Sequence, residues 1–164
     1  MQEQHFGPIW FIPGQNKGKY PYCHSIYLDG PGILIDPASD RNRLIELRND
    51  PGVKAVWLSH WHEDHFLHLD LFDDIPLSIT SKDAPPLSNI EAFLDGYGIE
   101  PQDREMWRNI AVDMFHFRPR KPDQYLAAGK SFTFGSLKIN ILAAPGHTPG
   151  SIALHFPNQD ILFI

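Results

Sequence analysis

Ser-His-Trp-His-Glu-Asp-His, residues 59–65, is the most informative stretch of this chain of 164 residues. Three histidines and one aspartate fall within its last six positions. Neutral imidazole and carboxylate are the ligand types preferred by zinc and its first-row neighbours. A solvated polar loop is the alternative, but four ligand-type side chains this close together favour a metal site.

The residues just before this stretch predict where it is mounted. Val53–Leu58 is β-branched and aromatic, follows Pro51-Gly52, and has the length of a strand. A rigid sheet fixes side chains carried by the loops at its strand ends while leaving them reachable. We therefore expect the histidines at the edge of a sheet.

The spacing adds a second indication. In an extended loop His60 and His62 project to the same side, because the side chains of extended backbone alternate with a period of two. The two imidazoles can then share one ion. Asp64, two residues after His62, projects to the same side as the two histidines, whereas His65 does not. We therefore expect Asp64 and His65 to bind a metal ion at a neighbouring position. The layout favours two adjacent metal ions.

Three segments together resemble a known family. His60-x-His62-x-Asp64-His65 resembles the signature motif of the metallo-β-lactamase-fold hydrolases, glyoxalase II among them. Ile33–Pro37 resembles the strand and aspartate that precede the first helix of that family, and Ala144–Ser151 resembles the segment that carries its next metal ligand. The segments occur in the family's order over nearly the whole chain.

This resemblance implies an α+β fold, the αββα sandwich, formed by residues 1–164 as one domain. It implies that His60, His62 and His147 hold one ion and that Asp64 and His65 contribute to a second. Asp64 would also be the catalytic residue that positions the nucleophile. The expected cofactor is zinc, one or two ions, with iron or manganese as the alternatives.

Composition limits the class of partner and the compartment. A formal net charge of −6 argues against a basic nucleic-acid-binding face. The single cysteine, Cys23, excludes an intrachain disulfide and favours the cytoplasm. The start of the chain lacks the pattern of a secretory signal, and no stretch approaches the ~20 apolar residues that span a bilayer. We expect a soluble protein that acts on a small molecule, with no nucleic-acid or membrane partner.

Further elements follow from turn and periodicity signals. Ser39 is expected to cap a helix through Leu44, Ile45 and Leu47, which form one apolar stripe. The other predicted strands are Ile9–Ile12, Cys23–Leu28, Ile33–Asp36, Leu77–Thr80, Ser131–Phe134, Leu137–Leu142, Ser151–Phe156 and Ile161–Ile164.

Residues 85–118 change to a helical pattern and predict a helical hairpin inserted between strands. Most of its apolar side chains are expected to pack on the domain, while one edge overhangs the metal cleft. We expect substrate contacts first from Trp61, Tyr97 and Phe117.

Two further side chains remain open at this stage. Asp36 either supports the metal ligands or simply ends its strand before Pro37. His68 follows His65 by three residues and would share its helical face, but the family motif does not use that position. We expect His68 to be a partly exposed histidine on a short helix.

The end of the chain departs from the family pattern. In relatives, the strand that corresponds to Ile161–Ile164 is followed by an aspartate that bridges the two metals and later by a further histidine. This sequence is therefore expected to be the N-terminal portion of the domain, C-terminally incomplete, or to be completed by another chain. An uncovered sheet face would expose apolar surface and favour self-association.

The expected function is metal-dependent hydrolysis of a small ester, thioester or lactone by metal-activated water. A β-lactam is less favoured, because the fold and the metal motif alone do not define that substrate. Two alternatives stay open: a catalytically impaired metal-binding fragment that acts as an interaction module, and an enzyme similar to a mono-iron sulfur dioxygenase.

Overall fold

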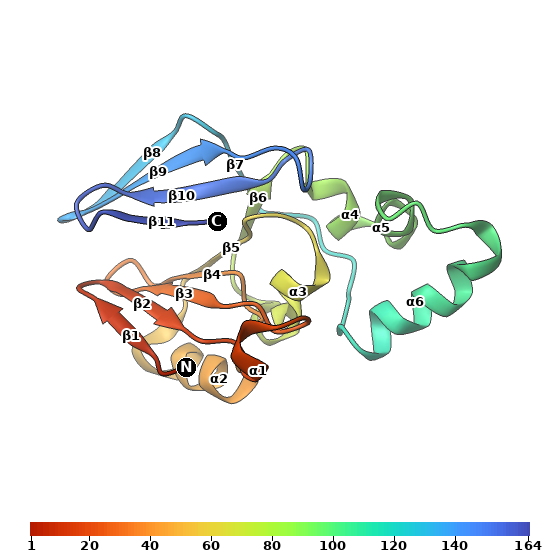
Figure 1. The fold of residues 1–164 in the computed structure, drawn as a ribbon, viewed down its shortest axis with the longest axis horizontal. Coiled ribbons are helices and arrows are strands. Elements are labelled where there is room, and N and C mark those ends of the chain that lie inside the picture. Colours follow the sequence, from red (N-terminus) through yellow and green to blue (C-terminus); the bar gives the residue numbers. More distant parts are fainter.

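Two stacked β-sheets with helices beside the larger one make up the fold (Figure 1). The computed structural model describes all 164 residues. The larger sheet has seven strands in the order β1-β2-β3-β4-β5-β6-β7, and the smaller has four in the order β11-β10-β9-β8. The layers are therefore helix, sheet and sheet. They correspond to the first three layers of the α+β sandwich expected from the sequence.

The larger sheet mixes antiparallel and parallel pairing. β1 to β4 form an antiparallel meander, and β4 to β7 pair in parallel. Parallel neighbours end at the same sheet edge, so the loops after β4, β5 and β6 meet there. The strands are β1 Gln4–Phe6, β2 Ile9–Ile12, β3 Ser25–Leu28, β4 Ile33–Ile35, β5 Ala55–Trp57, β6 Leu77–Thr80 and β7 Gln124–Leu126.

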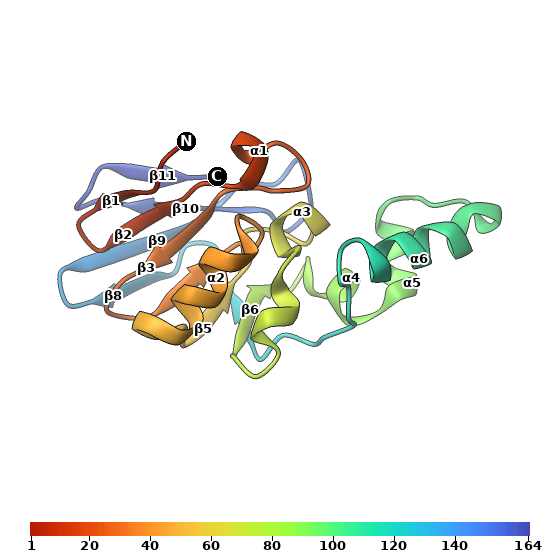
Figure 2. The same cartoon turned by 90° about the horizontal axis from the view of Figure 1, so that it is seen from below.

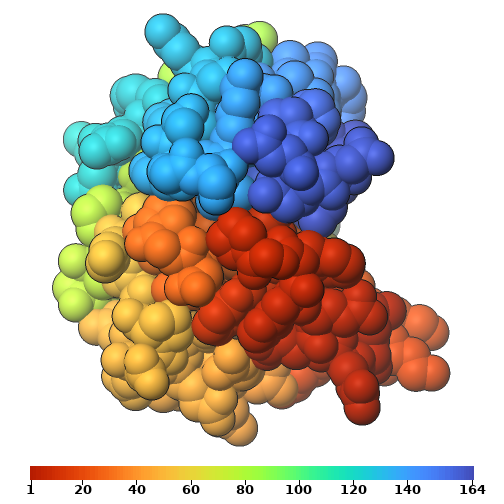
Figure 3. Space-filling view, turned by 90° about the vertical axis from the view of Figure 1, so that its left-hand side faces the viewer, coloured from red at the N-terminus to blue at the C-terminus, as the bar shows by residue number.

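The smaller sheet is antiparallel throughout and packs on the first through alternate residues. Leu137, Ile139 and Ile141 point inward and join the core between the two sheets. Figure 3 shows the two halves meeting along one seam. The strands are β8 Ser131–Phe134, β9 Leu137–Ala143, β10 Ile152–Phe156 and β11 Ile161–Phe163.

The outer face of the smaller sheet differs from the expectation of a broad apolar surface. Alternation turns Lys138, Asn140 and His155 outward, together with the exposed side chains of Leu142 and Leu162. Polar side chains therefore separate the apolar ones, and the premise for strong self-association is weaker than the sequence suggested.

The helix after β4 begins one residue later than predicted. Asp40, rather than Ser39, is the N-cap of α2, because its carboxylate accepts from the backbone N–H of Arg43 at 3.0 Å. Ser39 is instead fully buried. The helices are α1 Gln15–Gly18, α2 Arg41–Leu47, η1 Arg48–Gly52, α3 Glu63–Phe66, η2 Leu69–Phe72, α4 Ala84–Ser88, α5 Ile90–Gly96, η3 Pro101–Asp103 and α6 Arg104–Asp113.

The helical insertion between β6 and β7 projects away from the sheets (Figures 1 and 2). Phe93 and Leu94 of α5 reach the core beneath the larger sheet. Most apolar side chains of the insertion were expected to pack on the domain, but Met106 and Met114 are 53% and 61% exposed. No helix has both the length and the apolar character needed to cross a bilayer.

Candidate metal centre

Three histidines from two loops converge at the edge where both sheets end. His60 and His62 follow β5, whereas His147 lies on the loop between β9 and β10 of the other sheet. One ring nitrogen of each lies within 4.8 Å of the others. The His147 ring centroid is 4.8 Å from that of His60 and 4.4 Å from that of His62. The packing of the two sheets therefore assembles the ligand set expected for the first ion.

A second group of ligand-type atoms lies beside the first. It consists of His60, Asp64 and His65, whose ligand atoms again lie within 4.8 Å of one another. His60 belongs to both groups. Only Asp64 and His65 are therefore left to the second position once an ion occupies the first.

The chemistry of the first group fits a metal ion. The Nε2 atom of His60 is buried and has no hydrogen-bond partner, which is unusual for a buried polar atom. Nδ1 of His62 and Nε2 of His147 face each other at 2.8 Å. Three imidazoles that leave a fourth position open form the ligand set of a catalytic zinc site.

Asp36 supports both groups from beneath. Its carboxylate is fully buried and accepts from the backbone N–H of Ser59 at 2.8 Å, the Ser59 hydroxyl at 2.7 Å and His65 Nδ1 at 2.9 Å. Its backbone φ is +51°, a left-handed conformation that is uncommon outside glycine. Of the two interpretations left open by the sequence, the contacts favour support of the ligands.

The contacts of Asp36 also fix the protonation of two imidazoles. The Ser59 hydroxyl donates its hydrogen bond to Asp36, so its oxygen accepts from His60 Nδ1 at 3.0 Å. His65 likewise carries its proton on Nδ1. In the neutral form, both rings then present an unprotonated Nε2, the arrangement that hydrogen-bonded carboxylates impose on metal-binding histidines.

Burial keeps two imidazoles of the first group, His60 and His62, neutral. It lowers the pKa of His60 to about 2, and the nearby imidazoles of His65, His62 and His147 lower it further. Burial and His147 lower the pKa of His62 to about 4. Burial alone would lower the pKa of His65, but the Asp36 carboxylate outweighs it and raises that pKa. Neutral imidazole is the form that binds a metal.

Open space adjoins the histidines. A pocket of about 270 Å³ is lined by His60, His65 and His147 together with Ser151 and Ile164. Asp64 is partly exposed nearby, and burial raises its pKa. A small molecule therefore has access to the predicted ligands.

The three aromatic residues expected to contact substrate occupy different environments. Trp61 is only 4% exposed and packs on Phe93 and Tyr97. Tyr97 is partly exposed, and its ring stacks on that of His62 with centroids 5.1 Å apart. Trp61 has little surface to offer a substrate, whereas Tyr97 lies directly beside the predicted ligands.

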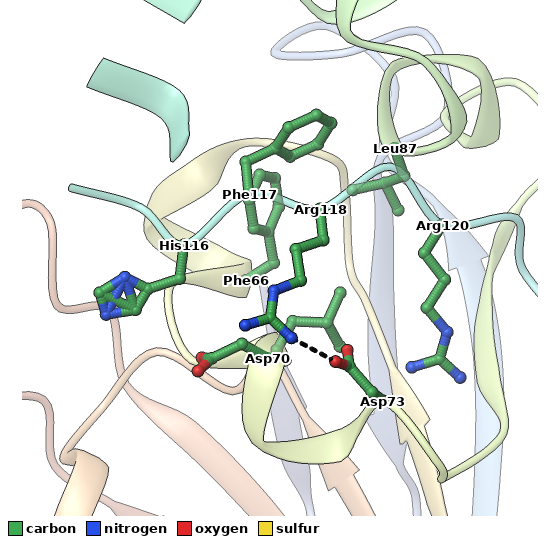
Figure 4. A pocket seen from close by; sticks show the side chains of 9 residues that line it. Phe66, Asp70, Asp73, Leu87, His116, Phe117, Arg118 and Arg120 are labelled. Carbon is green, nitrogen blue, oxygen red and sulfur yellow. Dashed lines mark hydrogen bonds and ion pairs between the residues drawn. The ribbon is translucent and has the colours of Figure 1, made fainter. Parts of the chain in front are cut away.

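Phe117 lies in another part of the core. Its ring is 4% exposed and packs on Phe66 and Phe93. Phe117 lines a hollow of about 10 Å³, room for a single water molecule. Figure 4 shows it among the lining residues, with the ion pair of Arg118 and Asp73. The prediction that Phe117 touches substrate therefore has no support from its position.

His68 lies outside both ligand groups, as the family motif implied. It is not the partly exposed residue expected from the sequence, because only 6% of it is accessible. Its Nδ1 lies 3.5 Å from the guanidinium of Arg41. The side chain belongs to the packing beneath the site.

Glu63 is a residue of the site that the sequence did not single out. Its buried carboxylate accepts from the hydroxyl of Tyr20 at 2.7 Å and from that of Tyr97. These phenols come from the loop before β3 and from the insertion, so Glu63 ties both to the metal loop. Its place between His62 and Asp64 was visible in the sequence, but both partners are remote and carry no local signal.

Comparisons with known proteins agree with this geometry. The sequence model of the metallo-beta-lactamase superfamily matches residues 20–164. A probable metallo-hydrolase of Streptococcus pyogenes is 25% identical over 79% of this chain and 54% of its own length. An acyl-coenzyme A thioesterase of Gallus gallus is 30% identical over 84% of this chain and 46% of its own.

Two further matches concern a shorter segment and the fold. A hydroxyacylglutathione hydrolase of Rhizobium johnstonii is 44% identical over 25% of this chain and 16% of its own length. The crystal structure of the metallo-beta-lactamase GOB-18 of Elizabethkingia meningoseptica superposes with a TM-score of 0.66 at 17% identity, covering 95% of this chain and 56% of that one. The chain spans little more than half the length of the first curated relatives it matches.

Proposed function

This chain belongs to the metallo-beta-lactamase superfamily, and on that premise we propose that it is a metal-dependent hydrolase of a small ester, thioester or lactone. One observation carries the proposal. His60, His62 and His147 converge from two sheets, and the buried Nε2 of His60 has no protein partner.

In this proposal each residue has a distinct role. His60, His62 and His147 hold one divalent ion, most simply zinc, which supplies a Lewis acid and makes water a better acid when bound. Asp64 orients the attacking water, and His65 contributes with Asp64 to a second, weaker position. Asp36 and Ser59 keep the ligand imidazoles in the required tautomer.

A thioester is the substrate class we favour. Among the relatives matched by sequence above, the one aligned over the largest share of this chain, 84%, is named an acyl-coenzyme A thioesterase. The pocket beside the histidines has the size for a small acyl group. Tyr97, stacked on His62, is the side chain we assign to the substrate-facing wall.

The metal and the compartment are parts of the same proposal. We favour zinc over iron or manganese because three neutral imidazoles with an open position suit it. The single, partly buried cysteine supports a reducing compartment such as the cytoplasm.

A hydrolysis screen with matched variants tests the proposal. Zinc-loaded protein is offered an acyl-coenzyme A thioester, an aryl ester and a lactone. We expect activity on the thioester that is lost on chelation and in His60→Ala. The control His155→Ala removes a histidine from the outer face of β10 and should retain the activity.

The same experiment separates the alternatives. Zinc retention without turnover of any of these substrates would favour a metal-binding interaction module. Iron-dependent oxygen uptake would favour a sulfur dioxygenase. Activity that survives both chelation and His60→Ala would contradict the proposal itself.

A further inference from the structure

Asp83 is a buried carboxylate that no part of the proposed mechanism uses. It follows β6 by three residues and has no accessible surface. A carboxylate without solvent must be compensated by hydrogen bonds, since burying a charge is costly. The position of its donors indicates what the side chain does.

The groups that face Asp83 belong to the two loops that carry the predicted metal ligands. The Thr148 hydroxyl donates to Oδ2 at 2.5 Å, and the backbone N–H of Gly150 donates to Oδ1 at 2.7 Å. The backbone N–H of Trp61 lies close enough to the same carboxylate to lower its pKa. Thr148 follows His147 directly, and Trp61 lies between the other two histidines. One carboxylate therefore bridges the loops of the two sheets where they carry the ligands.

The surrounding contacts leave this bridge little freedom. The Thr80 hydroxyl donates to the carbonyl of Gly150 at 2.8 Å. A Cβ on Gly150 would lie 2.4 Å from Asp83 Oδ1 and 2.3 Å from Thr80 Oγ1, so only glycine allows the backbone to approach this closely. The backbone after His147 is thus held against the end of β6.

We propose that Asp83 is a positioning residue of the metal centre, which sets the distance between His147 and the pair His60 and His62. This inference rests on the proposed function. Asp83 touches no ligand side chain and acts through Thr148, Gly150 and Trp61. Removal of such supporting contacts typically weakens metal affinity 10- to 100-fold.

Asp123 offers a matched control for general destabilisation. It flanks the other end of the same strand, where its Oδ2 accepts from the backbone N–H of Leu77 at 2.8 Å. Its loss removes an acceptor from β6 without touching either ligand loop. Asp123→Ala should lower the melting temperature and leave zinc affinity unchanged.

The test measures zinc affinity by chelator competition in four variants of the full chain, alongside melting temperature. We expect Asp83→Ala to bind zinc roughly 10- to 100-fold more weakly. Asp83→Asn should recover most of the affinity, because its oxygen can accept from Gly150 and its amide can donate to Thr148. Thr148→Val, which removes the bond from the Thr148 hydroxyl and leaves the one from Gly150, should fall between. Asp123→Ala is the fourth variant and serves as the control.

Two readouts follow the geometry itself. With cobalt in place of zinc, Asp83→Ala should lose the strong visible absorption of a tetrahedral site, because His147 is no longer held in place. In the metal-free protein, the Gly150 amide should exchange with solvent faster in Asp83→Ala than in Asp123→Ala.

The outcomes separate this inference from the proposed function. If wild type binds no zinc, the proposed function fails and this inference fails with it. If wild type binds zinc and Asp83→Ala binds it equally well despite a lower melting temperature, Asp83 is merely structural and only this inference is overturned. Should Asp83→Ala not fold, Thr148→Val decides: weaker zinc binding supports the proposal, and unchanged binding overturns it.

Discussion

His68 places a titratable group in the core beneath the site. Burial and the neighbouring guanidinium of Arg41 lower its pKa from 6.5 to about 4, against the opposing charges of Asp70 and Asp40. The unfolded chain therefore takes up a proton near pH 6.5 that the folded chain refuses until about pH 4. The stability that follows from this difference is fully present above pH 6.5 and is lost as the pH falls toward 4.

We predict that His68→Gln flattens the acid sensitivity of the fold. Between pH 7.5 and 5 the wild-type free energy of unfolding should fall by about 2 kcal/mol more than that of the variant, from about 1.4 kcal/mol per pKa unit. Urea unfolding of metal-free protein at both pH values measures this. His155→Gln, on the outer sheet face, should follow wild type; equal slopes in His68→Gln and wild type would refute the prediction.

The residues of the site were predictable to different degrees. The spacing of His60, His62 and His65 predicted a metal-binding loop, because these ligand-type residues lie close together in the sequence. His147 required the family resemblance, since 85 residues separate it from His62. Glu63 and Asp83 were missed for a physical reason: their roles depend on donors that only tertiary packing brings near.

At the scale of elements, Glu63 joins three segments through two phenols. The hydroxyls of Tyr20 and Tyr97 both donate to its buried carboxylate. Tyr97 follows α5, so this contact attaches the helical insertion to the metal loop. When one phenol is lost, the Glu63 carboxylate still accepts a hydrogen bond from the other. When both are lost, its buried charge is left unpaired.

We predict that the double variant Tyr20→Phe, Tyr97→Phe is destabilised by more than the sum of the two single effects. Each single variant should lower the free energy of unfolding by roughly 1–3 kcal/mol, and the double variant should exceed their sum by about 1 kcal/mol. Chemical denaturation of the four proteins gives the coupling. Tyr125→Phe alters an exposed phenol and should be neutral. Additive effects would mean that the two tyrosines do not share Glu63.

Element boundaries show where sequence patterns lose resolution. The strand predicted at Leu137–Leu142 was found as Leu137–Ala143, but the strands Gln4–Phe6 and Gln124–Leu126 were missed. Both are three residues long, lie at the edges of the larger sheet and are largely exposed, so no alternation marks them. Their pairing partners, rather than their own residues, define them.

At the scale of the molecule, we predict one tightly held metal ion per chain. The two ligand groups share His60, so the second position retains only Asp64 and His65. Elemental analysis after extensive dialysis should find about one equivalent in wild type and in His65→Ala, and far less in His147→Ala. Two equivalents in wild type would require ligands beyond those assigned here.

We also predict weak self-association through the outer face of the smaller sheet. Leu142 and Leu162 are 41% and 52% exposed there, but Lys138, Asn140 and His155 divide the surface. Sedimentation should show association that rises with concentration and is reduced in the double variant Leu142→Lys, Leu162→Lys. Met106→Lys removes an exposed apolar side chain from α6 and serves as control. A variant that associates like wild type would exclude this face.

A metal ion bound at the seam between the two sheets would also hold the sheets together. His62 belongs to one layer and His147 to the other, so separating the layers pulls apart the groups that would hold the ion. An ion that binds only the closed sandwich favours closure by mass action, by about 2.7 kcal/mol at one hundred times its dissociation constant. The supply of metal in the surroundings would then set how firmly the two layers stay together.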